Sequence, residues 1–165
     1  MVTRAGVEAR IADAAIARAV AGALAAARAP EPGAVTVVLT DDEELADLNR
    51  EHMGIDGPTD VLSFPMLPPE SFLHLAAGDP GPRPRKPPRG VGADRIQIGD
   101  IAISVEPAFE QAEQGRGGQT GDVHWSPADE LLLLVTHGTL HLCGWDHAEP
   151  AEERAMRALE RRLLG

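Results

Sequence analysis

The sequence predicts an α/β or α+β domain in which helices pack around a small β-sheet. Segments whose apolar residues recur every three or four positions, as in amphipathic helices, alternate along the chain with short β-branched runs typical of buried strands. The chain has 165 residues, which suits one domain and leaves little room for a second. We therefore expect a single domain over residues 1–165.

Three short segments rich in β-branched and apolar residues predict the strands. In the last of them the alternation of isoleucines reverses phase at Gly99–Asp100, which indicates either a bulge or a strand buried on both faces. The three predicted strands are residues 35–40, 59–64 and 95–104.

Five segments are predicted to be helical. Thr40 and Glu43 have the spacing of a capping box at the start of the second helix. Ser126 followed by Pro127 is a typical helix start and Gly144 a typical stop, and the segment between them is so apolar that we expect burial nearly all round. In the final helix the apolar residues are predicted to face inward and the glutamates and arginines outward. The predicted helices end before residue 30 and span residues 41–52, 106–114, about 126–144 and 150–164.

The composition favours a cytoplasmic protein. No uncharged apolar run reaches the roughly 18–20 residues that a membrane-spanning helix needs, so no membrane association is expected. A single cysteine, Cys143, excludes an internal disulfide framework and fits a reducing compartment. Residues 19–27 faintly resemble a signal peptide, but Glu8, Asp13 and Arg18 place charges in the N-terminal segment before them and favour an amphipathic helix.

Charge is distributed unevenly along the chain. The net charge of -11 argues against binding nucleic acid by bulk charge alone. Residues 66–94 are rich in proline and are predicted to form a flexible insertion outside the core. Between residues 78 and 95, five basic residues against two acidic ones give a local charge of +3 and leave the remainder of the chain at -14. The insertion is either a solvated loop or a basic arm that reaches a polyanion.

The segment HGTLHLCGWDH carries the clearest chemical signal in the sequence. His137 and His141 are four positions apart on a predicted helix, so their side chains lie about 40° apart around the axis and about 6 Å apart along it. Gly144 allows the chain to turn back, and His147 then supplies a third nitrogen ligand. Three neutral imidazoles suit Zn²⁺ and leave a position for a water, whose pKa the metal lowers. Asp146 is expected to hydrogen-bond one of the three histidines without binding the metal itself.

The histidine spacing is similar to that of the metzincin proteases, so the sequence predicts a zincin-like helix with three histidine ligands. Gly138 stands where the metzincins carry the glutamate that acts as general base, and this replacement counts against a peptidase. Cys143 is a poor fourth ligand because it lies roughly 200° from His141 around the helix axis.

Three motifs together resemble the YbeY family of metal-dependent endoribonucleases, which are rRNA maturation factors. The resemblance covers roughly residues 35–165 apart from the insertion. The motifs are HGTLHLCGWDH at 137–147, NREH at 49–52 followed by GPTDVLSFP at 57–65, and IGDI at 98–101.

The resemblance implies one Zn²⁺ per chain, held by His137, His141 and His147. It implies a mixed sheet with the metal helix packed beneath it and a groove leading to the metal. The implied activity is cleavage of single-stranded rRNA near the 3′ end of the small-subunit rRNA, in ribosome biogenesis in the cytoplasm. The implied partners are single-stranded rRNA and the small ribosomal subunit or its assembly factors.

Asp60, Ser63 and Asp100 are candidate catalytic residues lining that groove. Ser63 is suited to position a phosphate and either aspartate to accept a proton, but all three equally suit hydrogen bonds at strand ends and turns. Many family members carry an arginine where this chain has Met53, so we consider Arg50, one turn back, as the residue that contacts RNA.

Two questions stay open at this point. The nucleophile is either a metal-bound water or the RNA 2′-hydroxyl. The alternative functions are a ribosome-assembly binding module with a structural zinc, and a zinc hydrolase of peptides or small molecules.

Overall fold

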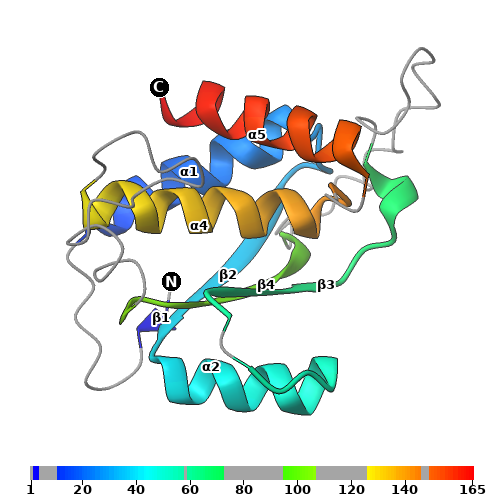
Figure 1. Cartoon of the computed structure of the whole chain (residues 1–165). Coiled ribbons are helices and arrows are strands. Elements are labelled where there is room, and N and C mark those ends of the chain that lie inside the picture. The colour runs from blue at the N-terminus through cyan, green and yellow to red at the C-terminus, as the bar shows by residue number, and fades with distance from the viewer. Residues whose placement is uncertain (1, 4–10, 58, 73–94, 107–125, 146–148) are drawn as a thin grey trace.

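The computed structural model describes residues 2–3, 11–57, 59–72, 95–106, 126–145 and 149–165 (Figure 1). Its centre is a four-stranded sheet in the order β1-β2-β4-β3. Strand β2 runs parallel to β1 and to β4, whereas β3 pairs antiparallel with β4, so the sheet is mixed, as expected. The strands are β1 (Val2–Thr3), β2 (Gly33–Thr40), β3 (Val61–Pro65) and β4 (Ile96–Ser104).

Helices cover the two faces of the sheet unequally. Figure 1 shows α1, α4 and α5 on one side and α2 on the other. Among the described residues, no helix is long and apolar enough to cross a membrane. The helices are α1 (Asp13–Ala26), α2 (Asp42–Leu48), α4 (Pro127–Leu142) and α5 (Pro150–Leu164), with a π-helical turn, η1 (Asn49–Met53), directly after α2. The predicted α+β class is confirmed.

Strand β4 separates two apolar layers. Ile101 and Ile103 belong to the large core on the α1 and α4 side, whereas Ala102, between them, packs with Leu45 and Leu62 in a smaller core under α2. Because side chains alternate along a strand, odd-numbered positions of this part of β4 face α4 and even-numbered positions face α2.

The predicted irregularity in β4 is confirmed, and both of its alternative explanations hold. Ala34 pairs with Gln97 and Val35 with Gly99, so Ile98 is an extra residue in β4. From Ile101 to the end of the strand every residue is buried, because helices cover both faces. The bulge lies just before the phase reversal that the sequence shows at Gly99–Asp100.

Two local predictions need correction. The residue that caps α2 is Asp41, which accepts a hydrogen bond from the Glu44 backbone at 2.9 Å, so the cap lies one position later than the Thr40–Glu43 pattern predicted. Thr40 instead donates its hydroxyl proton to the Glu44 carboxylate. The start of the predicted insertion is also part of the core, because Phe72 is only 3% exposed and packs with the large cluster. The rest of the insertion and the helix predicted over residues 106–114 lie outside the described residues, apart from Glu106.

Candidate metal centre

Helix α4 is a fixed support for the two histidines that it carries. Ser126 and Asp129 form a reciprocal capping box at its start, with backbone-to-side-chain distances of 3.2 and 3.0 Å. Most of its side chains are buried, as its apolar sequence predicted. The helix ends at Leu142, and Gly144 adopts a φ of +82°, which allows the chain to leave the helix axis.

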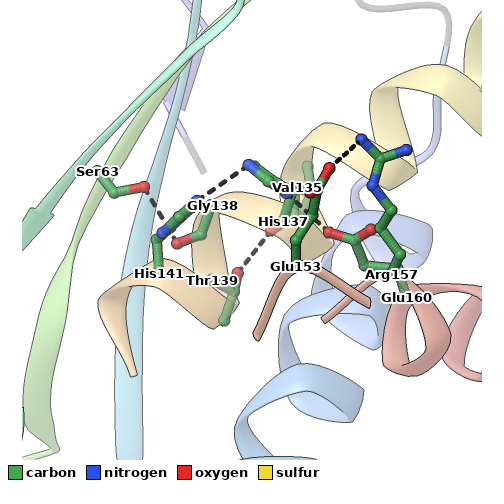
Figure 2. A network of polar contacts seen from close by, with 9 residues as sticks. All are labelled: Ser63, Val135, His137, Gly138, Thr139, His141, Glu153, Arg157 and Glu160. Atoms are coloured by element: carbon green, nitrogen blue, oxygen red, sulfur yellow. Dashed lines mark hydrogen bonds and ion pairs between the residues drawn. The ribbon is translucent and has the colours of Figure 1, made fainter. Parts of the chain in front are cut away.

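His137 and His141 point toward one another from successive turns of α4 (Figure 2). Their Nε2 atoms are 3.0 Å apart, and their rings meet edge to face with centroids 4.5 Å apart. The spacing of four positions thus brings two imidazole nitrogens to one point in space, as predicted. Two such nitrogens converging on one point match the donor set that Zn²⁺ prefers.

Glu160 of α5 contacts the far side of the His137 ring. Its Oε1 lies 2.7 Å from His137 Nδ1, and the two side chains are 5% and 14% exposed. With the carboxylate as acceptor, we assign the ring proton to Nδ1, which leaves the Nε2 lone pair directed at His141. Histidines that bind metals commonly make this contact with a carboxylate.

The sequence interpretation had placed the glutamates of the last helix outward, which is wrong for Glu160. A signal was present, however, because Glu160 follows Met156 by four positions and precedes Leu163 by three, on the stripe that faces the core. A charged residue on an apolar stripe indicates a buried partner. The partner itself comes from another helix, which the sequence pattern does not reveal.

The third predicted ligand, His147, lies outside the described residues, as does Asp146. Within the part of the chain that the structure describes, no group of three histidine, cysteine, aspartate or glutamate side chains gathers around one point. His137 and His141 nevertheless fit a metal, because both present Nε2 and the first has a buried carboxylate behind it. Burial raises the pKa of the Cys143 thiol to about 12, so this cysteine stays protonated and unsuited to bind metal near neutral pH.

Gly138, between the two histidines, faces the sheet. A Cβ at this position would lie 3.0 Å from Val61 Cγ2, 3.2 Å from Ile101 Cγ2 and 3.3 Å from Ser63 Oγ. The glutamate of the metzincin pattern has no room here, because α4 approaches β3 and β4 too closely. The close packing of α4 against β3 and β4 therefore favours glycine at this position.

Ser63 is the catalytic candidate that contacts α4, the helix that carries His137 and His141. Its hydroxyl donates a hydrogen bond to the Gly138 carbonyl at 3.1 Å (Figure 2). A serine hydroxyl has one proton to donate, and here that proton joins β3 to α4. This contact joins the edge strand β3 to α4 at Gly138, between the two histidines.

The other candidates lie elsewhere in the fold. Asp100 occupies an even-numbered position of β4, so its side chain is on the α2 face, opposite the histidines, where it accepts a hydrogen bond from Gln97 Nε2 at 3.0 Å. Asp60 directly precedes β3, and its carbonyl accepts from the Ser104 backbone at 3.1 Å. Arg50 is exposed in η1, where it forms an ion pair with Asp47. The structure thus brings Ser63 to α4 and places Asp100 on the far face of the sheet.

Comparison with known proteins identifies the family. The sequence matches the family described as "Endoribonuclease YbeY" over residues 3–165. A protein of that name from Salinispora tropica is 44% identical over 130 residues, which cover 79% of this chain and 71% of the relative. Another, from Symbiobacterium thermophilum, is 40% identical over 131 residues, which cover 79% of this chain and 69% of the relative. The chain therefore belongs to the YbeY family of endoribonucleases.

Proposed function

We propose that this protein is a zinc-dependent endoribonuclease that cleaves single-stranded rRNA near the 3′ end of the small-subunit rRNA, in the cytoplasm. The observation that carries the proposal is the convergence of the His137 and His141 Nε2 atoms, 3.0 Å apart, in a member of the YbeY family. His147 is the proposed third ligand. When bound, Zn²⁺ supplies an acidified water and positive charge beside a phosphate.

The protein's own residues prepare this site. The capped and buried helix α4 fixes the two imidazoles, and the Glu160 carboxylate lies 2.7 Å from His137 Nδ1. Ser63 joins β3 to the helix through the Gly138 carbonyl. Asp60, directly before β3, is the aspartate that we retain as a candidate proton acceptor, since Asp100 is on the far face of the sheet.

The charge of -11 shapes the expected interaction with RNA. Because the net charge is strongly negative, we expect the protein to gain little affinity by neutralising phosphates. Its affinity for free RNA should therefore be weak and should fall as salt is added. Specificity then comes from the small ribosomal subunit or its assembly factors. The proposal predicts that the isolated protein binds arbitrary RNA poorly at physiological salt, and tight binding there would contradict it.

The direct test combines metal analysis with RNA cleavage. The purified protein is expected to hold one zinc per chain and to cleave single-stranded RNA in preference to a duplex, and a chelator is expected to abolish both. His141→Ala should lose zinc and cleavage while it stays folded, whereas His52→Ala, a histidine exposed in η1, should keep its zinc. Absence of metal together with cleavage that is indifferent to chelator would reject the proposal.

Two further readouts separate the alternatives. If His141→Ala still cleaves RNA while lacking zinc, the metal does not take part in the reaction. If the wild type binds ribosomal particles but cleaves no RNA, the protein is a binding module with a structural zinc. The ends of the RNA products identify the nucleophile, because a 2′,3′-cyclic phosphate results from attack by the 2′-hydroxyl and excludes direct attack by water.

A further inference from the structure

Glu160 is a buried acidic side chain in a helix whose other charged residues are largely exposed. It is 4% exposed, and its Oε1 lies 2.7 Å from His137 Nδ1. Burying a carboxylate away from water is costly unless the carboxylate is paired. The burial of Glu160 therefore makes its contact with His137 the feature to explain. The contact spans 23 positions of the sequence and joins α5 to α4.

The packing of α5 determines where Glu160 lies. Met156 and Leu159 pack with Leu140 of α4 and Ala23 of α1 in a separate apolar cluster. Leu140 directly precedes His141, so the cluster and the histidine pair occupy the same stretch of α4. When α5 packs into this cluster, Glu160 faces the Nδ1 side of His137.

We propose that Glu160 is a positioning residue that fixes the tautomer and ring orientation of His137, so that Nε2 faces His141 and the pair is ready for a divalent cation. This inference rests on the proposed metal function. Without an acceptor at Nδ1, the imidazole is free to carry its proton on Nε2 or to turn its ring, and either change removes the lone pair from the point where the two Nε2 atoms meet.

Two substitutions of Glu160 separate charge from hydrogen bonding. Glu160→Gln keeps an acceptor oxygen at nearly the same place, and Glu160→Leu removes it. Since partners of metal-binding histidines typically contribute about 10- to 100-fold in metal affinity, we expect Glu160→Leu to weaken zinc binding by that amount and Glu160→Gln by less. Glu153→Gln is the matched control, because Glu153 is on the same helix and pairs with Arg157 at 2.7 Å. It should bind zinc as the wild type does.

A second control distinguishes positioning from simple stabilisation of α5. Leu159→Val loosens the apolar cluster without changing a polar group near His137. If Glu160 only anchors the helix, Leu159→Val and Glu160→Gln will lose zinc affinity in proportion to their loss of stability. If it positions His137, zinc affinity falls in the Glu160 variants alone. Zinc affinity is measured by competition with a chelating dye, and stability by urea unfolding.

The tautomer of His137 gives a readout without metal or activity. In the metal-free wild type, nitrogen NMR of the imidazoles should show the His137 proton on Nδ1, and Glu160→Leu should lose this preference. Equal zinc affinity and an unchanged His137 tautomer in both Glu160 variants would overturn the inference. If instead the wild type binds no zinc, the proposed function loses its metal, and the tautomer measurement still decides whether Glu160 orients His137.

Discussion

Gly138→Ala measures how tightly α4 packs against the sheet. The added Cβ would lie 3.0 Å from Val61 Cγ2 and 3.2 Å from Ile101 Cγ2, closer than ordinary carbon contacts. The contacted groups are branched side chains in a packed layer, so they yield only with movement of their neighbours. Gly22→Ala in α1 is the matched control, because its nearest atom would be Leu163 Cδ2 at an ordinary 3.7 Å.

The two substitutions share one favourable effect and differ in one unfavourable effect. Alanine is preferred over glycine in a helix by about 1 kcal/mol, which should stabilise Gly22→Ala by that amount. Overpacking a core typically costs about 1–3 kcal/mol, so Gly138→Ala should be destabilised by a net amount of up to about 2 kcal/mol. The difference between the variants, about 1–3 kcal/mol, isolates the steric cost at Gly138.

Urea unfolding measures this difference. With a typical dependence of about 2 kcal/mol per molar urea, the unfolding midpoints of the two variants should differ by roughly 0.5–1.5 M. Gly138→Ala should also bind the proposed zinc more weakly, because the helix must move away from β3 to admit the methyl group. If Gly138→Ala is as stabilising as Gly22→Ala, the helix does not approach the sheet as closely as described.

Three further predictions concern single side chains. Ser63→Ala removes the hydrogen bond to the Gly138 carbonyl and should cost about 0.5–1.5 kcal/mol in urea unfolding; complete loss of RNA cleavage at unchanged stability would show a catalytic role instead. Ser126→Ala removes the cap of α4 and should cost about 1 kcal/mol by the same measurement, and no loss would contradict the cap. Burial raises the pKa of Cys143 from 9.0 to about 12, so the unfolded chain loses this proton first and the free energy of unfolding should fall as pH rises from about 9 toward 12. Because the chain has no tyrosine and Lys86 is its only lysine, Cys143→Ala should remove most of this slope; an unchanged slope would refute the assignment.

Elements with strong local signals could be predicted from the sequence. Helix α4 starts where a serine, a proline and an acidic residue fall within four positions, and it ends shortly before Gly144. The last helix has the predicted bounds, Pro150–Leu164. These signals act within one turn of helix, so they do not depend on the rest of the fold. The histidine pair was predictable for the same reason, because a spacing of four on a helix fixes the relative direction of two side chains.

The features that the sequence did not reveal depend on which elements meet in space. Asp100 is a polar residue within the IGDI motif shared with the family, and only the strand alternation shows that it faces α2 instead of α4. The bulge at Ile98 makes that alternation hard to follow from the sequence, because it shifts the phase within one strand. Glu160 is similar, since its position on the apolar stripe is local information but its partner His137 belongs to another helix.

The position of the acidic residues changes how the net charge of -11 bears on RNA binding. Among the described residues, the exposed carboxylates of α2 and η1 lie across the sheet from the histidine pair (Figure 1); they include Asp42, Glu43, Asp47 and Glu51. Each packed layer adds about 10 Å, which puts these charges roughly 20 Å from α4. The Debye length at physiological salt is about 8 Å, so salt screens most of their repulsion at that distance. A phosphate at His137 and His141 therefore meets less negative potential than the net charge implies, and a dication bound there would add positive potential that mainly the nearby carboxylates offset.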